Sequence, residues 1–468
     1  MERKIVPIIP AVEIEQHLYE KRQKIYPREV HGIFAKLRIA AVVTLLGLYY
    51  GVAWLQWSGR QAVLFDLPAR KFYVFGQTFW PQDFFYLTLL LIFAALALFF
   101  FTTLAGRLWC GYACPQTVWT ETFLWIERLV EGSRSQQIRL DKAKGSRNTI
   151  VRKTIKHALW IIFSLWTGFT FVGYFTPIRE LGLDVLALSV TGWSLFWILF
   201  YSFATYGNAG WMREQVCLHM CPYARFQSSM FDKNTLIISY DVARGEPRGK
   251  LKAKAASPTS TGDCIDCTLC VQVCPTGIDI RQGLQYECIG CAACIDACDE
   301  VMEKTKKPKG LIRYTTENAL EGNPARLLRP RVIIYATVLL ALLTVLIYSI
   351  TQRKLVDIDV IRDRNALYRE LDDGTIENTY TLKILNKTEQ PQRFKLTATG
   401  LDELILQSDD EIIEVDSGSV KNLVVRLQIH YEQVPATSNQ VEFHIASESD
   451  PDLRTLEPAR FLAPQMDN

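Results

Sequence analysis

The sequence predicts a multi-domain membrane protein with a five-helix transmembrane bundle, an inserted cysteine-rich domain and a C-terminal β-sandwich. Three observations support this prediction. Long apolar segments recur through the first three quarters of the chain, all 12 cysteines lie between Cys110 and Cys298, and polar and apolar side chains alternate in residues 351–468. A chain of 468 residues is long enough for about three domains.

Five segments are apolar enough to cross a bilayer, which takes about 20 residues. A buried core helix is the alternative for any one of them, and the fourth segment is the most polar. The N-terminal part, residues 1–38, is not expected to be a cleaved signal peptide, because a long charged stretch precedes the first apolar block. The five predicted spans are residues 39–57, 84–104, 158–176, 185–206 and 331–350.

The distribution of Lys and Arg predicts the orientation of these spans. Basic residues are frequent in residues 1–38, 105–156 and 207–330 and sparse in the loops 58–83 and 177–184. Because basic loops stay in the cytoplasm, we expect a cytoplasmic N-terminus and cysteine-rich domain. An odd number of spans then places the C-terminal part on the far side. The basic residues of the N-terminal segment are Arg3, Lys4, Lys21, Arg22, Lys24, Arg28, Lys36 and Arg38.

The C-terminal part alternates in the manner of antiparallel strands. ENTYTLKILN (residues 377–386) and RFKLTATGL (residues 393–401) place apolar side chains at every second position, with a turn at residues 386–388 between them. Further alternating segments at similar spacing predict an immunoglobulin-like β-sandwich. It has no cysteine and no catalytic cluster, so we expect a binding or assembly module. Asn386-Lys-Thr matches a glycosylation sequon, a match that we attribute to chance.

Two stretches of the membrane region share one pattern, in which an apolar helix leads into a short polar corner and then C-x-x-x-C-P. The first contains Cys110 and Cys114, and the second contains Cys217 and Cys221. This repetition indicates a duplicated helical hairpin with approximate two-fold symmetry. The proline after each pair suits the first turn of a new helix. We therefore expect each pair at a helix–helix corner at the inner membrane surface, where the two corners can meet.

Three interpretations of these four cysteines remain open. They could be structural thiols packed at the corner, or a thiol–disulfide relay, although redox motifs usually have C-x-x-C spacing. They could also form a soft-metal site, because thiolate and thioether ligands select Cu(I), and Met212 and Met220 lie beside the second pair. His219 could join such a site. The same thiols could instead hold zinc or another iron site.

Two cysteine runs, CIDCTLCVQVCP (residues 264–275) and CIGCAACIDACD (residues 288–299), have the spacing of bacterial-type two-cluster ferredoxins. In each run three closely spaced thiolates bind one 4Fe–4S cube, and the fourth cysteine binds the other cube. A structural zinc site is the alternative, but it usually has two C-x-x-C pairs rather than triplets. Asp299 stands after the last cysteine, where the bacterial pattern has proline. The predicted ligands are Cys264, Cys267, Cys270 and Cys298 for cluster one, and Cys288, Cys291, Cys294 and Cys274 for cluster two.

Several functions are excluded by what the sequence lacks. No C-x-x-C-H, G-x-G-x-x-G or P-loop motif occurs, so we expect no c-type haem, dinucleotide or ATP. The net charge of +3 gives no reason to expect a nucleic-acid partner.

Taken in order, these motifs resemble the FixG/CcoG (RdxA) cytochrome c oxidase accessory proteins, a family of membrane polyferredoxins. The resemblance covers nearly the whole chain and rests on WCGYACPQTVW, HMCPYARFQ and the two cluster runs. Residues 107–298 alone also resemble the NapH-type polyferredoxins, which pass electrons from quinol. The first resemblance implies a bacterial inner-membrane protein that helps to build the cbb-type haem–copper oxidase. It also implies a periplasmic C-terminal domain.

The resemblance implies an oxidoreductase, a cupric reductase that converts Cu(II) to Cu(I) at Cys110, Cys114, Cys217 and Cys221. The alternatives are a quinol-oxidising electron donor and a non-enzymatic oxidase assembly scaffold. We expect copper ions as substrate, and as partners a cytoplasmic electron donor, copper chaperones or a copper exporter, oxidase subunits and membrane lipid. The predicted parts are a cytoplasmic segment (1–38), a four-helix membrane region (39–206), a cytoplasmic segment (207–330) with the diferredoxin domain at about 255–310, a fifth span (331–350) and the periplasmic sandwich (351–468).

Overall fold

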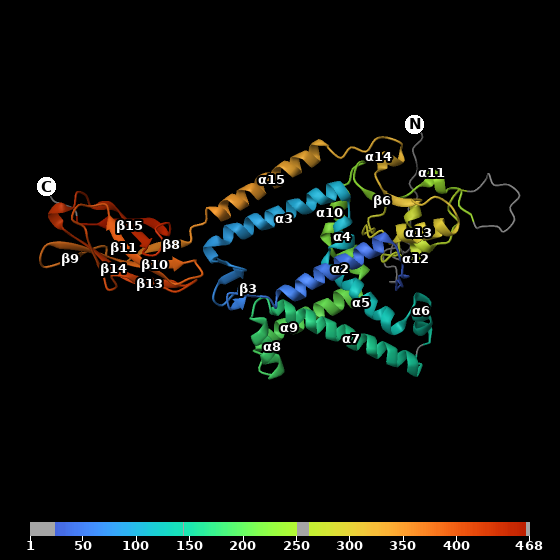
Figure 1. The fold of residues 1–468 in the computed structure, drawn as a ribbon, viewed down its shortest axis with the longest axis horizontal. Helices are drawn as coiled ribbons and strands as arrows, with labels where there is room; N and C mark the ends of the chain where they lie inside the picture. The colour runs from blue at the N-terminus through green and yellow to red at the C-terminus, as the bar shows by residue number, and fades with distance from the viewer. Residues whose placement is uncertain (1–23, 144, 250–261, 465–468) are drawn as a thin grey trace, which may run out of the picture. The chain divides into compact units, whose positions relative to one another are not determined.

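The structure of this chain is a computed structural model that describes residues 24–143, 145–249 and 262–464 (Figure 1). The basic residues Arg3, Lys4, Lys21 and Arg22 and the start of the predicted diferredoxin domain lie outside the described residues. The chain divides into two units. One comprises residues 1–51, 94–172 and 189–337, and the other comprises residues 52–93, 173–188 and 338–468.

Four helices of the described residues are long and apolar enough to cross a membrane. They overlap the first, second, third and fifth predicted spans. In three of them 11% or less of the span is buried inside the protein, as expected for surfaces that face lipid, whereas 39% is buried in Arg147–Val172. These helices are α2 (Ile33–Val52), α3 (Phe84–Ala105), α7 (Arg147–Val172) and α15 (Pro330–Thr351).

The fourth predicted span, residues 185–206, differs from the expectation. Its first residues belong to the end of helix α8 (Ile178–Leu186) and a following turn. Helix α9 (Gly192–Thr205) begins only after Thr191, whose hydroxyl accepts a hydrogen bond from the Ser194 N–H, and it has 14 residues. It continues into a π-helical turn, η2 (Tyr206–Met212). The described residues therefore contain four spanning helices rather than five, and the five-helix bundle is not confirmed.

Shorter helices connect these spans within the first unit. Helix α5 (Pro115–Glu131) packs beside α7, and α7 packs beside α9 (Figure 1). Proline at its first position suits the start of α5, and Gly132 with a positive φ of 83° ends it. Phe123 and Trp160 are buried where these helices meet. The other short helices are α4 (Leu108–Tyr112), α6 (Arg134–Lys142) and α10 (Pro222–Met230).

In the sequence, the cysteine-rich part lies between β6 (Ile237–Tyr240) and β7 (Ile312–Thr315). These two strands pair with each other in an antiparallel sheet. Helix α13 (Ala293–Lys304) packs on helix α12 (Leu269–Gln272) and on β7. Buried Ile238, Ile312 and neighbouring residues form its core. The remaining elements are α11 (Val242–Gly245), the 3-10 turn η4 (Ile280–Gln282) and α14 (Glu317–Leu320).

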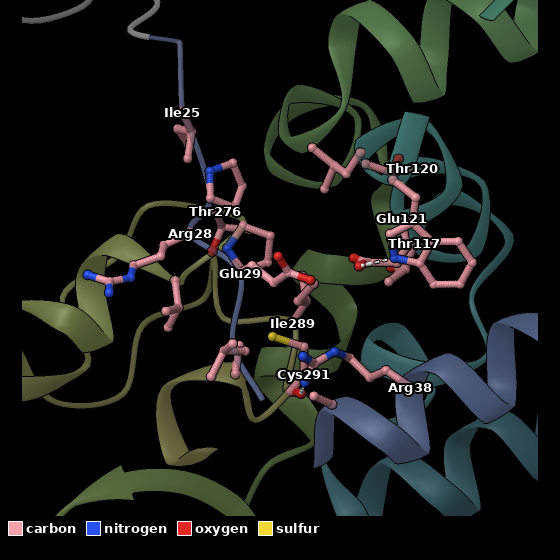
Figure 2. A pocket seen from close by; sticks show the side chains of 18 of the residues that line it. Ile25, Arg28, Glu29, Arg38, Thr117, Thr120, Glu121, Thr276, Ile289 and Cys291 are labelled. Carbon is pink, nitrogen blue, oxygen red and sulfur yellow. Dashed lines mark hydrogen bonds between the residues drawn. The ribbon is translucent and has the colours of Figure 1, made fainter. Parts of the chain in front are cut away.

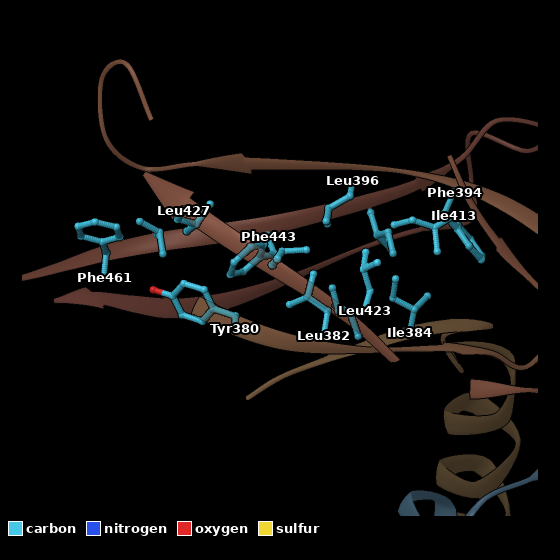
Figure 3. Packing of buried hydrophobic residues seen from close by; sticks show 14 of the residues in the cluster. Tyr380, Leu382, Ile384, Phe394, Leu396, Ile413, Leu423, Leu427, Phe443 and Phe461 are labelled. Carbon is cyan, nitrogen blue, oxygen red and sulfur yellow. The ribbon is translucent and has the colours of Figure 1, made fainter. Parts of the chain in front are cut away.

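The second unit contains the β-sandwich that the alternation predicted. One sheet has the order β12-β14-β10-β8 with β9 beside β10, and the other has the order β13-β11-β15-β16. Tyr380, Leu382 and Ile384 of β10 are fully buried, and Figure 3 shows them gathered between the sheets. The strands are β8 (Val356–Arg362), β9 (Arg369–Glu370), β10 (Thr375–Asn386), β11 (Gln392–Thr399), β12 (Ile405–Ser408), β13 (Ile413–Val415), β14 (Val420–His430), β15 (Ser438–Ser447) and β16 (Arg454–Leu462).

The loop predicted between the first two spans folds into small sheets in the same unit. Gln61 connects it to a second loop, because its side chain donates to Gly173 O (2.7 Å) and accepts from Ile178 N (2.9 Å). Arg353 forms a buried ion pair with Asp83 (2.5 Å). The strands are β1 (Gln56–Trp57), β2 (Arg60–Gln61), β3 (Val63–Asp66), β4 (Lys71–Val74) and β5 (Gln77–Phe79).

The Asn386 side chain builds the turn between β10 and β11. It is fully buried, and its amide donates to the carbonyl oxygens of Gln390 (2.8 Å) and Val415 (3.1 Å). Its carbonyl oxygen accepts from the N–H (3.0 Å) and the hydroxyl (2.7 Å) of Thr388. These contacts give the Asn-Lys-Thr sequence a structural role, which a glycan on this buried amide would abolish.

Replacing Asn386 with Ala is expected to destabilise the sandwich by about 3 kcal/mol, because several buried backbone groups lose their partner. The measurement is the urea midpoint for proteolysis of the C-terminal part in the full chain. Exposed Asn365→Ala is the control, with a midpoint expected near that of the wild type. An Asn386→Ala midpoint equal to that of the control would contradict this role.

Candidate metal centre

The two cysteine runs fold into the same loop. The residue before the second cysteine has a positive φ in each run, 53° at Asp266 and 69° at Gly290. The residue after it does so as well, 56° at Thr268 and 60° at Ala292. A short helix then begins in each loop, α12 in the first and α13 in the second. Three non-glycine residues in this left-handed region represent local strain that the surrounding packing must hold, as is typical of ligand-binding loops.

The cysteines of these loops line two separate hollows. The first hollow has Leu311 and Met302 in its wall, and Arg281 also lines it. The second hollow has Ile238 and Ile280 in its wall, and Cys270 borders both hollows. The structure thus brings each predicted set of four cysteines together, with the fourth member coming from the other run. The first hollow is lined by Cys264, Cys267, Cys270 and Cys298, and the second by Cys274, Cys288, Cys291 and Cys294.

The chemistry of these donor sets suits iron–sulfur clusters. Burial raises the pKa of the Cys270 thiol to about 11 and those of Cys291 and Cys298 to about 12. Such thiols are protonated at neutral pH until a metal displaces the proton. Among the described residues, no three His, Cys, Asp or Glu side chains have the spacing to hold a single metal ion. Four cysteines line the first hollow and five line the second, with Cys270 in both, and such sets of thiol donors are the ligands that iron–sulfur clusters use.

The C-x-x-x-C-P cysteines lie at two helix corners, as the repeat predicted. Cys110 is in α4 and Cys114 immediately precedes α5. Cys217 is in a π-helical turn, η3 (Val216–Met220), and Cys221 immediately precedes α10. Burial, together with the neighbouring thiols Cys114 and Cys217, raises the pKa of Cys110 to about 12. Because Arg107 and Cys110 of the first corner donate to Ala224 O and to the Gln227 side chain of α10, the two corners lie close together.

Two further groups lie at the corners. The Cys110 thiol donates to the side-chain oxygen of Gln227 (3.5 Å). Gln227 is fully buried, and its amide nitrogen has no hydrogen-bond partner in the described structure. Nothing in the sequence pattern singled out this glutamine. A separate hollow is lined by His219, Met220 and Cys221, whereas Met212 does not line it.

A buried group of charges holds the second corner against α5. Glu127 accepts from Arg213 (2.7 Å) and pairs with Lys156 (3.4 Å), and Lys156 also pairs with Glu131 (2.8 Å). All four side chains are nine-tenths buried or more. Arg213 has a φ of 46°, a strained conformation for a non-glycine residue. Its guanidinium also donates to Gly210 O (2.9 Å), which helps to hold this backbone conformation. This group was not predicted from the sequence. The one available signal was the spacing of Glu127 and Glu131, which lie four residues apart on one face of the helix.

The first corner rests on the loop of the second cysteine run. The Arg107 guanidinium is buried and donates to the carbonyl oxygens of Cys288 (3.2 Å), Ala224 (2.5 Å) and Tyr286. Gly111 lies between the two cysteines of this corner, and a Cβ atom added there would lie 2.9 Å from the Cys291 backbone. Glycine is therefore required for this close backbone approach.

Two tryptophans have packing roles. Trp160 lies tilted against Phe123 (5.3 Å between ring centroids), donates to Phe123 O and has the Lys156 ammonium over its ring. Trp57 packs edge-on against Phe75.

Family comparisons agree with this geometry. The 4Fe-4S dicluster domain family matches residues 212–317, the 4Fe-4S binding domain family matches residues 87–131, and the IG-like fold at the C-terminus of FixG matches residues 346–464. The nitrogen fixation protein FixG of Rhizobium meliloti is 38% identical over 431 residues, which cover 84% of this chain and 82% of that protein. This chain belongs to the FixG family.

Two more proteins are similar to this chain. Protein RdxB of Cereibacter sphaeroides is 42% identical to this FixG family member over 403 residues, covering 83% of this chain and 84% of RdxB. The crystal structure of a FixG-related protein from Vibrio parahaemolyticus is 29% identical over 24% of this chain and 97% of that one, with a TM-score of 0.21. The relatives and domain families confirm the predicted family, the immunoglobulin-like C-terminal domain and the presence of iron–sulfur clusters. This FixG family member is an iron–sulfur electron-transfer protein with membrane helices.

Replacing Glu127 with Gln is expected to cost about 3 kcal/mol, because Arg213 and Lys156 lose a buried anionic partner. Burial alone would raise the pKa of Glu127, but Arg213, Lys156 and Lys24 lower it. The stabilisation is therefore present above the ordinary pKa, about 4.3, and is lost as the pH falls through the folded value.

Thermal unfolding in detergent, measured between about pH 3.5 and 7, reports both the loss of stability and its pH dependence, because a carboxylate titrates near the lower end of this range. The wild-type midpoint should fall more steeply on acidification than that of Glu127→Gln. Glu300→Gln, which breaks an exposed pair with Lys304, is the control and should cost about 0.5 kcal/mol at most. Equal midpoints for Glu127→Gln and this control at pH 7 would show that the buried group does not stabilise the corner.

Proposed function

We propose that this protein is a membrane-bound cupric reductase that converts Cu(II) to Cu(I) during assembly of a cbb-type haem–copper cytochrome c oxidase. The observation that best supports this proposal is the close contact of Gly111 with the Cys291 backbone. Through this contact the first C-x-x-x-C-P corner lies against a loop whose cysteines suit an iron–sulfur cluster. If the corner holds copper, the electron carrier and the copper site would be adjacent.

In this proposal Cys264, Cys267, Cys270 and Cys298 hold cluster one, and Cys288, Cys291, Cys294 and Cys274 hold cluster two. Bound clusters would supply single electrons where Gly111 contacts the Cys291 backbone. Arg107 positions this contact, because its guanidinium binds carbonyl oxygens of the cluster-two loop and of α10. The reductant is a reduced electron carrier in the cytoplasm.

The four corner thiols, Cys110, Cys114, Cys217 and Cys221, receive copper as the substrate. Cu(II) gains one electron and becomes Cu(I), which thiolates and thioethers prefer. Two sulfurs suffice for Cu(I), so the corners need not surround one ion with three or more ligands. Each thiol that binds Cu(I) releases its proton to water, and burial keeps the thiols of Cys110 and Cys217 protonated before copper binds. His219 and Met220 next to Cys221 offer further ligands along the path by which Cu(I) leaves.

The proposed location is the bacterial inner membrane, with the N-terminus, the clusters and both corners in the cytoplasm. The distribution of Lys and Arg along the sequence supports this orientation. It would place the sandwich in the periplasm, where it could meet oxidase subunits. Copper chaperones or a copper exporter would take the Cu(I) from the cytoplasmic side.

Replacing Gly111 with Ala is expected to slow the oxidation of reduced clusters by Cu(II) about 10²-fold, because the added methyl group forces the corner away from the Cys291 loop. Stopped-flow absorbance of the anaerobic, dithionite-reduced protein measures the rate. Gly47→Ala is the matched control, since no atom lies within 4 Å of its added Cβ. A Gly111→Ala rate equal to that of the control, with cluster absorbance retained, would contradict electron passage through this contact.

Changing all four corner cysteines to Ser tests the proposed function itself. The wild type should oxidise its clusters with a matching yield of Cu(I), and the variant should lose at least about nine tenths of that rate while keeping its cluster spectrum. If wild type and variant reduce copper alike, the corners are not the copper site. If neither reduces copper, the scaffold alternative gains support, provided that cluster variants still assemble the oxidase.

A further inference from the structure

A cavity of about 280 Å³ reaches both redox elements of the first unit. It lies between the segment that precedes α2 and helix α5, and Figure 2 shows residues of these elements facing one another across it. Cys217 of the second corner and Cys291 of the cluster-two loop both line it. Its size is close to that of pockets for small ligands, which begin at about 300 Å³.

The cavity carries an excess of positive charge. Five Arg or Lys side chains and three Glu side chains line it. Within the described residues, no carboxylate pairs with Arg28, Lys36 or Arg38, and Arg38 donates to Cys291 O (2.5 Å). Two of the carboxylates, Glu29 and Glu121, are already neutralised in part because both approach Arg128, at 3.8 and 2.8 Å.

The other lining groups suit a compact organic molecule. Leu124, Trp125 and Ile289 provide apolar walls, and the hydroxyl groups of Thr117, Thr120 and Thr276 provide polar ones. These features suit an anionic metal complex. The cations at the rim would attract its negative charge, the apolar walls would contact its organic part, and the thiol could accept its metal. A bare Cu(II) cation would be repelled by the same rim.

We propose that this cavity binds Cu(II) as an anionic, low-molecular-weight carboxylate complex and delivers it to Cys217. This inference rests on the proposed function and specifies its substrate. Cu(II) in the complex accepts one electron, which the cytoplasmic carrier supplies. The resulting Cu(I) exchanges the hard carboxylate oxygens for sulfur. The chelator leaves as the free anion, and the Cys217 proton passes to water.

Binding is tested first with a redox-inert probe, Zn(II)–nitrilotriacetate, by calorimetry on the full chain in detergent. The variant is Arg28→Glu with Lys36→Glu, which reverses two rim charges without touching a cysteine. The control is Lys306→Glu with Lys309→Glu, two exposed lysines outside the cavity. The Kd is expected to rise about tenfold or more in the variant and to stay at the wild-type value in the control.

The same proteins are then supplied with Cu(II) in two forms. For anionic Cu(II)–nitrilotriacetate the KM should rise in the variant with little change in kcat. For cationic Cu(II)–ethylenediamine the KM should fall or stay unchanged. Equal KM values for both complexes in all three proteins would overturn the cavity proposal while leaving copper reduction in place. Zinc chelate binding that depends on the rim, without any copper reduction, would support the cavity and overturn the proposed function.

An anionic phospholipid shares the charge of such a complex. Titration with phosphatidylglycerol in the same detergent distinguishes the two. If the lipid binds and the zinc chelate does not, the cavity is a lipid site and the proposal is wrong. If the chelate binds in the presence of excess lipid, the proposal stands.

Discussion

The buried charges of Glu127, Glu131, Lys156 and Arg213 are the constraint on which the candidate site depends. Two acids of α5 need partners, because an unpaired charge at this depth would cost several kcal/mol. Lys156 comes from a membrane helix and Arg213 from the strained turn after α9, so satisfying the charges brings three helices together. Since α5 begins at the first corner and Arg213 precedes the second, the same contacts set the distance between the two pairs of cysteines.

A second set of contacts connects these corners to the cysteine-rich loops. Arg107 donates to backbone carbonyls of the cluster-two loop and of α10, and Gly111 allows the backbones to touch. Neither residue carries redox chemistry. In the proposed function, they would shorten the path between a one-electron carrier and a group of thiols that prefers the reduced form of copper. The positively charged cavity beside them would attract the anionic Cu(II) complex that we propose as the substrate.

Local patterns made part of this structure predictable. Alternation fixed the inward face of β10 at Tyr380, Leu382 and Ile384, and the cysteine spacing predicted which thiols share a hollow, because three members of each set are close in sequence. The fourth span is not confirmed, and an apolar composition does not reveal the Thr191 cap or the π-helical turn after α9. The roles of Glu127, Arg107 and Gln227 depend on partners far along the chain, which no local spacing records. Asn386 was dismissed as a chance sequon, although its amide organises a turn.

The most direct test of copper reduction at the corner cysteines is to determine the ligands that surround copper in the protein. The reduced full chain is mixed anaerobically with one equivalent of Cu(II), and X-ray absorption at the copper edge is recorded after the clusters have been oxidised. We expect Cu(I) with sulfur neighbours, and a loss of sulfur neighbours when the cysteines of either corner are changed to Ser. Copper that remains Cu(II), or that keeps oxygen and nitrogen neighbours unaffected by those changes, would contradict copper reduction at the corner thiols.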